Sequence, residues 1–262
     1  MTELSIIIPN YNTKNFLEKC LYSIKENPPS STYEVIVIDD ASEDGSREMI
    51  EKKFPLVKLI WNKKNLGLSK SFNIAIRKSS GSFILLLNSD TLIFPKSIDE
   101  MLSTLEANPD AGIAGCRLLN KDGSTQFTFG YFPFPFSFIK RKLFKKKLKE
   151  KREPFAVDWV CYACVLIKRE VIQDIGLFDE DFVFYNEEID YSYRAKKKGW
   201  NTIYTPRASI IHFQGGWVNT KGTDYMRENT LRSNYLFLKK HKGIFEAVPA
   251  VVFLKLKYLF GK

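Results

Sequence analysis

"SFILLLNSD", residues 82–90, is a continuous apolar run that ends abruptly in small polar residues. Such a run is typical of a strand that is buried on both faces of a sheet. Earlier segments of the same character are residues 4–9, 33–40 and 57–62. Segments with helical spacing of apolar residues separate these strands, and another spans residues 95–107, with Pro95 in its first turn. This alternation predicts an α/β fold with a mostly parallel sheet and helices on both faces.

Polar residues stand at the ends of three of these predicted strands. "PNYN" follows the first strand, Asp39-Asp40 ends the second, and Asn88-Ser89-Asp90 ends the fourth. In an open parallel sheet, ligands bind beyond the carboxyl ends of the strands. The sequence therefore predicts one polar rim, although each cluster taken singly could be only a turn.

The pattern changes after residue 110. Residues 111–129 indicate a strand, an Asp-Gly turn and a second strand, and residues 131–155 form an insertion rich in Phe, Pro and Lys. Further elements are expected as a strand at 157–168, a helix at 185–200, a strand at 208–213 and two closing helices.

The net charge of +10 is concentrated in two segments. Residues 140–152 carry +8, from nine basic residues and one acidic residue, and residues 239–262 carry +5, which leaves −3 for the rest. This distribution favours a localised anionic partner such as a lipid surface over a nucleic-acid groove. Phe132, Phe134, Phe136 and Phe138 precede the first basic segment, and we expect these rings to sink into a membrane interface beside the lysines.

The four cysteines indicate reduced thiols in a core rather than a metal site. Cys161-x-x-Cys164 lacks the second pair that a zinc site needs, and its flanking residues resemble a strand. No apolar stretch reaches the ~18 residues of a membrane-spanning helix. We therefore expect a cytoplasmic protein that binds the inner face of the membrane peripherally.

The absence of several sequence motifs disfavours particular classes of enzyme. The chain contains neither G-x-G-x-x-G after the first strand nor G-x-x-x-x-G-K, which disfavours dinucleotide oxidoreduction and P-loop phosphoryl transfer. A nucleotidyltransferase would need basic residues near the first strand, and only Lys14 is present there. A non-catalytic membrane-binding or nucleic-acid-binding protein would not need carboxylates at the rim.

The ordered set of motifs resembles the family 2 glycosyltransferases of GT-A fold, and most closely their rhamnosyltransferase-like branch. The motifs are "SIIIPNYN", "VIVIDDASEDGS", "NLGLSKSFNIAI", "ILLLNSDT", "VDWVCYACVLIKREVI", "GLFDEDFVFYNEEIDYSYRAKKKGW" and "IIHFQGG". The resemblance implies one GT-A domain over residues 1–217, with a nucleotide-binding half at 1–110 and an acceptor and catalytic half at 111–217. A helical, basic and apolar tail would follow at 218–262.

The resemblance also implies the chemistry and its residues. It implies inverting transfer of a sugar from a UDP- or dTDP-sugar to the hydroxyl of a glycan or lipid-linked acceptor, in cell-surface polysaccharide or lipid-linked glycan synthesis. The positions that match the family's nucleotide-binding or donor-binding residues are Pro9, Asn12, Asp39, Asn65, Gly67, Asn73 and Ser89. Asp90 and His212 match ligands of a divalent metal, Mn²⁺ or Mg²⁺, and an imidazole ligand favours Mn²⁺.

Glu188 matches the catalytic base, with Glu187 as the competing candidate. The two side chains should point about 100° apart on a helix, so they cannot share one role. Asp190 is expected to pair with Arg194, four residues later. The sequence departs from the family pattern at Asn88, Glu188 and Tyr162, and the last of these could alter the donor or acceptor pocket. Trp159 and Trp217 could be core residues or platforms for a sugar ring.

Overall fold

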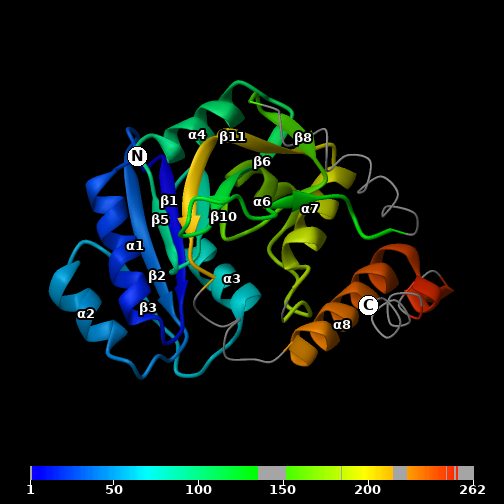
Figure 1. Cartoon of the computed structure of the whole chain (residues 1–262), viewed down its shortest axis with the longest axis horizontal. Helices are drawn as coiled ribbons and strands as arrows, with labels where there is room; N and C mark the ends of the chain where they lie inside the picture. Colours follow the sequence, from blue (N-terminus) through cyan, green and yellow to red (C-terminus); the bar gives the residue numbers. More distant parts are fainter. Residues whose placement is uncertain are drawn as a thin grey trace.

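The computed structural model describes residues 2–134, 152–183, 185–214, 223–245, 247–250 and 252. Within them, nine strands form a single sheet in the order β3-β2-β1-β4-β10-β6-β11-β5, and β8 also pairs with β11 (Figure 1). The strands are β1 (Leu4–Asn10), β2 (Tyr33–Asp39), β3 (Lys58–Trp61), β4 (Phe83–Leu87), β5 (Thr91–Ile93), β6 (Ala111–Leu119), β8 (Phe155–Val157), β10 (Cys164–Lys168) and β11 (Asn201–His212). Two short strands, β7 (Phe129–Gly130) and β9 (Trp159–Val160), pair separately.

The sheet is mostly parallel, as predicted. β3, β2, β1 and β4 run parallel to one another, and β6 and β11 form a second parallel pair. β10 lies antiparallel between β4 and β6, and β5 and β8 are antiparallel to β11. The carboxyl ends of β1, β2, β4, β6 and β11 therefore point toward the same side of the sheet.

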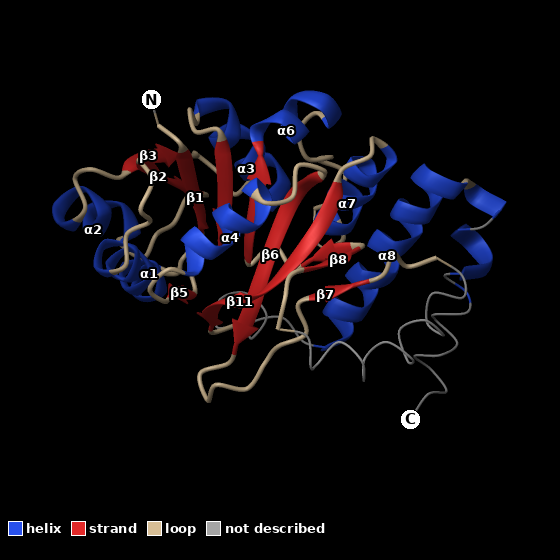
Figure 2. Cartoon of the chain, turned by 90° about the horizontal axis from the view of Figure 1, so that it is seen from above, coloured by secondary structure: helices blue, strands red, loops and turns tan. Residues whose placement is uncertain are grey.

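Helices cover both faces of the sheet (Figure 2). They are α1 (Lys14–Glu26), α2 (Ser46–Lys53), α3 (Leu68–Lys78), α4 (Ser97–Glu106), α6 (Arg169–Ile175), α7 (Glu187–Lys197) and α8 (Thr223–Lys242). Leu85 and Leu87 of β4 pack with residues of α1, α2 and α4, whereas Ile84 and Leu86 pack with residues of α3, α6 and α7. Because successive strand residues point to opposite faces, one apolar run fills two cores.

Several elements differ from the sequence expectation. The strand expected at 157–168 is divided into β8, β9 and β10, and α6 follows it directly. β11 begins at Asn201 rather than at 208, and its pairing with β6 shifts between Thr205 and Ser209. Pro206 lies in that irregularity, where a residue without a backbone N–H is tolerated. Pro95 precedes α4 rather than lying in its first turn.

The tail helix α8 packs against α7 through an aromatic cluster. Phe132 and Phe134 contact Tyr193 of α7 and Phe237 of α8, with ring centroids 5.0 to 6.4 Å apart. The expectation that Phe132 and Phe134 sink into a membrane is wrong, because Phe132 is buried and Phe134 packs against this cluster. Phe136, Phe138 and the basic residues 140–151 lie outside the described residues.

The second closing helix is only partly described. Residues 244–245, 247–250 and 252 are helical, and residues 253–262 lie outside the described residues. None of the helices that the structure describes is long and apolar enough to cross a membrane.

Candidate active site

The ends of β1 and β2 hold Asp39 at the rim of the sheet. Asn10 lies beside Asp39 in the strand register and donates from Nδ2 to Asp39 Oδ2 across 2.6 Å. The other carboxylate oxygen of Asp39 accepts from the backbone N–H of Ser42 at 2.8 Å. Asp39 is fully buried, so these two donors offset the desolvation of the carboxylate and fix its orientation.

Asn12 joins the loops that follow β1 and β2. Its Oδ1 accepts from the backbone N–H of Glu43 at 2.8 Å, and its own N–H donates to Ser42 Oγ at 2.9 Å. Pro9 lies one residue before Asn10 in β1. Pro9, Asn12 and Asp39, which the sequence places in one nucleotide pocket, therefore lie on adjoining strand ends. Sequence reasoning missed Asn10 and Ser42, which orient the Asp39 carboxylate.

Ser89 is brought to the same rim by a hydroxyl contact. Thr13 Oγ1 lies 2.7 Å from Ser89 Oγ and also donates to Asn10 Oδ1 at 2.6 Å. This contact links the end of β4 to the loop after β1, so the β4 rim residues lie next to the Asp39 site.

Asn65, Gly67 and Asn73 have different surroundings. Asn65 Oδ1 accepts from the N–H of Gly67 at 3.0 Å, and Gly67 has φ 82°, a left-handed value that favours glycine at the start of α3. Asn73 is buried behind that loop, where its amide bonds both the N–H and the carbonyl of Phe178 at 2.9 Å. Asn73 therefore fixes the chain leading to α7, and its expected place behind the nucleoside stays a prediction.

Asp90 and His212 face one another, although they are 122 positions apart in the sequence. Thr91 pairs with His212 where β5 meets β11, and the N–H of Phe213 donates to the carbonyl of Asp90 at 2.9 Å. Asp90 Oδ1 lies 3.4 Å from His212 Nε2. The short strand β5, which was not predicted, creates this proximity.

The Asp90–His212 pair fits a divalent cation. Two ligands at right angles, each ~2.1 Å from an octahedral cation, are roughly 3.0 Å apart, so little movement would be needed. His212 Nδ1 lies 3.0 Å from Gln126 Oε1, which orients the ring with Nε2 toward Asp90. Sequence reasoning missed Gln126. No third His, Cys, Asp or Glu completes a cluster among the described residues.

Glu187 and Glu188 open α7 after a strained turn. Tyr185 and Asn186 both have φ 67°, which is unusual for residues other than glycine. One oxygen of each carboxylate, Oε2, is buried without a hydrogen-bond partner among the described residues. Burial raises the pKa of Glu187 to about 7, and burial together with the neighbouring Glu187 raises the pKa of Glu188 to about 8. The two carboxyls therefore interact, which the expected 100° separation did not anticipate.

Comparison with known proteins decides the family. The model described as "Glycosyl transferase family 2" matches residues 5–176, about two thirds of the chain. The chain belongs to this family. It is accordingly a glycosyltransferase.

Relatives and solved structures agree with this assignment. The N-acetylglucosaminyl-diphospho-decaprenol L-rhamnosyltransferase of Mycobacterium tuberculosis is 24% identical over 93% of this chain and 87% of its own length. The low-salt glycan biosynthesis hexosyltransferase Agl10 of Haloferax volcanii is 29% identical over 91% of this chain and 78% of its own.

Two solved structures share the GT-A fold. The mannosyltransferase PcManGT from Pyrobaculum calidifontis, in complex with GDP-Man and Mn²⁺, matches with a TM-score of 0.67 and 18% identity. That match covers 99% of this chain and 76% of the mannosyltransferase. GalNAc-T7 with UDP, GalNAc and Mn²⁺ matches with a TM-score of 0.65 and 18% identity, over 92% of this chain but only 50% of GalNAc-T7.

The structure also shows the surroundings of other residues that the sequence analysis of this family 2 enzyme singled out. Asp190 bonds Arg194 Nε at 2.8 Å, which confirms the predicted pair. The Tyr162 ring is buried in the core 5.8 Å from the Phe178 ring. Trp159 donates from Nε1 to the carbonyl of Tyr131 at 3.0 Å and packs edge-on to Phe127. Trp217 lies outside the described residues.

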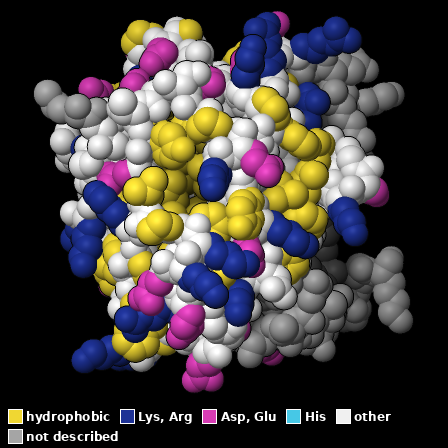
Figure 3. All heavy atoms as spheres, turned by 90° about the vertical axis from the view of Figure 1, so that its left-hand side faces the viewer, with side chains coloured by type: hydrophobic (Ala, Val, Ile, Leu, Met, Phe, Trp, Pro, Cys, Tyr) yellow, Lys and Arg dark blue, Asp and Glu magenta, His cyan; other side chains and the backbone are white. Residues whose placement is uncertain are grey.

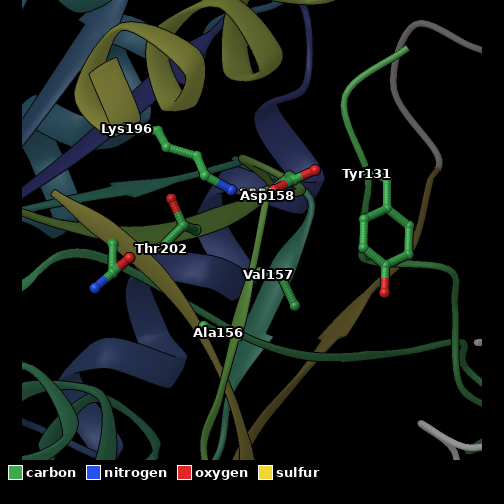
Figure 4. Close-up of a pocket in the computed structure, with 7 residues that line it drawn as sticks. Tyr131, Ala156, Val157, Asp158, Lys196 and Thr202 are labelled. Atoms are coloured by element: carbon green, nitrogen blue, oxygen red, sulfur yellow. Dashed lines mark hydrogen bonds and ion pairs between the residues drawn. The ribbon is translucent and has the colours of Figure 1, made fainter. Parts of the chain in front are cut away.

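Two hollows lie away from the rim of this enzyme. One is a cavity of about 100 Å³ near the start of β11. Figure 4 shows its lining, where Lys196 points toward Asp158 beside Thr202. A larger groove of about 390 Å³ lies near the start of β2, lined by Leu21, Ile24, Tyr33, Phe54 and Leu56 among others. Apolar side chains also gather on the surface shown in Figure 3. Both hollows adjoin the starts of strands, so neither belongs to the site at the carboxyl ends.

Proposed function

We propose that this enzyme transfers a sugar with inversion from a UDP- or dTDP-sugar to the hydroxyl of a glycan or lipid-linked acceptor. The observation that carries the proposal is the Asp90–His212 pair, 3.4 Å apart on the rim that also holds Asp39 and Ser89. One carboxylate and one imidazole suit a cation that also binds a diphosphate, because the diphosphate brings its own charge. Mn²⁺ or Mg²⁺ bound there would stabilise the charge of the leaving diphosphate.

The protein residues have separate roles in the proposed reaction. The family resemblance assigns Asp39 to accept from the base of the nucleotide; its carboxylate is fully buried and oriented by Asn10 and Ser42, so these loops must move to admit the base. Glu188 takes the proton of the acceptor hydroxyl while the hydroxyl oxygen forms a bond to the anomeric carbon. The bond between that carbon and the diphosphate oxygen breaks, and its electron pair leaves with the diphosphate. The raised pKa of Glu188 makes its carboxylate, once ionised, a stronger proton acceptor than an ordinary glutamate.

A panel of nucleotide sugars tests the donor class. UDP-, dTDP- and GDP-sugars are scored by thermal stabilisation of the full chain, with and without Mn²⁺. A donor at 100 times its dissociation constant should add about 2.7 kcal/mol to the free energy of unfolding. We expect UDP- or dTDP-sugars to stabilise the protein only when Mn²⁺ is present. Equal stabilisation without metal, or by GDP-sugars alone, would contradict the proposal.

The acceptor is proposed to be carried on a lipid, because the mycobacterial relative is named for a decaprenol-linked substrate. The enzyme would then bind an anionic inner membrane surface peripherally. In the tail, Phe245, Val248 and Val252 are 91%, 47% and 51% exposed, and their spacing puts them on one helical face. The buried Ala247 faces the aromatic cluster instead. Exposed Lys239 and Lys242 lie nearby in the sequence, at the end of α8, and would add cations beside this apolar face.

Vesicle sedimentation tests this docking with a matched control. The wild type, Phe245→Ser and Leu56→Ser are compared on anionic and neutral vesicles at low and high salt. Leu56 is 95% exposed on the loop between α2 and β3, so its substitution removes similar apolar surface elsewhere. We expect Phe245→Ser alone to lower binding, by about 10- to 150-fold, because burying a Phe side chain contributes roughly 1.5–3 kcal/mol. Equal pelleting with anionic and neutral vesicles, or an equal loss in both variants, would reject the docking.

A further inference from the structure

A chain of side-chain hydrogen bonds leads from the surface turn after β6 to His212. Ser124 Oγ lies 2.6 Å from Asp122 Oδ1, Asn120 Nδ2 lies 2.8 Å from Ser124 Oγ, and Gln126 Nε2 lies 2.8 Å from Asn120 Oδ1. Gln126 Oε1 then lies 3.0 Å from His212 Nδ1. Sequence reasoning gave this turn no role beyond a connection between strands.

The direction of the chain is fixed at its outer end. An ionised carboxylate only accepts, so the single hydroxyl hydrogen of Ser124 goes to Asp122. Ser124 Oγ must then accept from the amide NH₂ of Asn120, which turns Asn120 Oδ1 toward Gln126. Hydrogen bonds from the hydroxyl and the N–H of Ser124 lower the pKa of Asp122, which keeps it ionised at neutral pH.

A second anchor fixes Gln126 independently. Its Nε2 also lies 2.6 Å from the backbone carbonyl of His212, which can only accept. The Gln126 oxygen must therefore be the atom that faces His212 Nδ1. A ring nitrogen that faces an oxygen acceptor carries the hydrogen, so the neutral His212 ring is protonated at Nδ1 and bears a lone pair at Nε2.

The position of the hydrogen on Nδ1 of His212 determines what its other ring nitrogen, Nε2, presents to Asp90. When the ring is neutral, its Nε2 lone pair faces Asp90 Oδ1 at 3.4 Å, so two electron-rich atoms confront one another. A cation between them removes the repulsion, whereas a ring with its hydrogen on Nε2 would close the site by donating to Asp90.

We propose that Gln126, oriented by Asn120, Ser124 and Asp122, is a positioning residue that reserves the Nε2 lone pair of His212 for the metal. The inference rests on the proposed metal site, and it assigns the turn at residues 120–124 an influence on metal affinity without contact with the metal. Loss of such an outer partner typically lowers metal affinity 10- to 100-fold.

Nitrogen NMR of the metal-free protein tests the tautomer directly, because the chain has only two histidines. The full chain is labelled with ¹⁵N-histidine, and the ring signals are assigned with His241→Gln. At a pH where both rings are neutral, we expect His212 to carry its hydrogen on Nδ1. Gln126→Met should move that hydrogen to Nε2, and Gln126→Glu, which keeps an acceptor oxygen, should retain it on Nδ1. A wild-type ring protonated at Nε2 would overturn the proposal even if no variant folds.

A Mn²⁺ titration separates this inference from the proposed metal site. Paramagnetic broadening is followed at His212, with His241 as an internal control. We expect His212 to broaden selectively in the wild type and to need about 10–100 times more Mn²⁺ in Gln126→Met. Selective broadening that is unchanged in Gln126→Met would overturn the role of Gln126 and leave the metal site intact. Equal broadening of both histidines in the wild type would overturn the metal site and the inference together.

Discussion

Asp190 of α7 lies 2.7 Å from Nε2 of His241 on α8, while its other carboxylate oxygen lies 2.8 Å from Arg194 Nε. Asp190 is almost fully buried, so it needs both donors to offset the loss of water. Asn186, two residues before the candidate base Glu188, also donates to Asn234 of α8 at 3.0 Å. The tail helix is thus hydrogen-bonded to the helix that carries Glu188.

Removing the Asp190 side chain should destabilise the protein more than removing the His241 side chain, its partner on α8. Asp190→Ala removes the partner of two donors and leaves Arg194 without its carboxylate, so we expect a loss of about 3–5 kcal/mol in the free energy of unfolding. His241→Ala leaves the Arg194 pair in place and should cost about 1–3 kcal/mol. Urea denaturation of both variants measures the difference. Equal losses would show that the α7–α8 contact, not the Arg194 pair, holds Asp190.

The candidate base is tested by exchanging carboxyl for amide. Glu188→Gln should lower the transfer rate by about 10² or more, because an amide cannot take the acceptor proton. Donor affinity, measured by calorimetry, should barely change. Glu187→Gln is the matched control, since the two residues are adjacent and both have a buried oxygen. A silent Glu188→Gln together with a damaging Glu187→Gln would exchange their roles.

The same two carboxyls predict how stability changes with pH. Their folded-state pKa values, about 7 and about 8, lie above the ordinary value of 4.5. The folded state therefore holds protons that the unfolded chain has released, and the free energy of unfolding should fall as pH rises from about 4.5 through about 8. Glu188→Gln removes one such proton site. Urea denaturation should show this variant gaining stability over the wild type between pH 5 and pH 8.5, and a gap that does not widen with pH would contradict the expectation.

Substitution of the two proposed metal ligands should reduce Mn²⁺ binding to different extents. Asp90→Ala should abolish Mn²⁺-dependent binding of the donor and leave the fold intact, because Asp90 lies on the rim rather than in an apolar core. His212→Ala should weaken Mn²⁺ binding less. Calorimetry measures Mn²⁺ binding by each variant, and circular dichroism shows whether each variant is folded. Unchanged Mn²⁺ dependence in Asp90→Ala would reject the assignment, and unfolding of His212→Ala would make His212 a structural residue.

The sequence predicts the parallel half of the fold well because β1, β2 and β4 each contain an uninterrupted apolar run. It predicts the Asp190–Arg194 pair because a helix brings residues four apart together. β5 could not be predicted because three residues are too few for a periodic signal. The first half of β11 could not be predicted because Pro206 and its polar neighbours interrupt the apolar pattern.

Some residues of the candidate site could be predicted from the sequence, and others could not. The carboxylates at strand ends could be found because topology alone gathers them. Gln126 and His241 could not, because their contacts span 86 and 51 positions in the sequence and depend on side-chain packing. Asn10 was visible only as part of a turn, although it is the direct partner of Asp39.

The packing of Phe132 and Phe134 against α8 has a consequence for protein engineering. Phe134 contacts Tyr193 and Phe237, and Lys242 Nζ lies 4.9 Å from the centre of the Phe134 ring. Residues 132–134 and α8 therefore share one packing surface and should be exchanged together. A chimera that takes residues 132–134 from a relative without the matching α8 would put foreign side chains against Phe237, whereas a paired transplant would keep this surface whole.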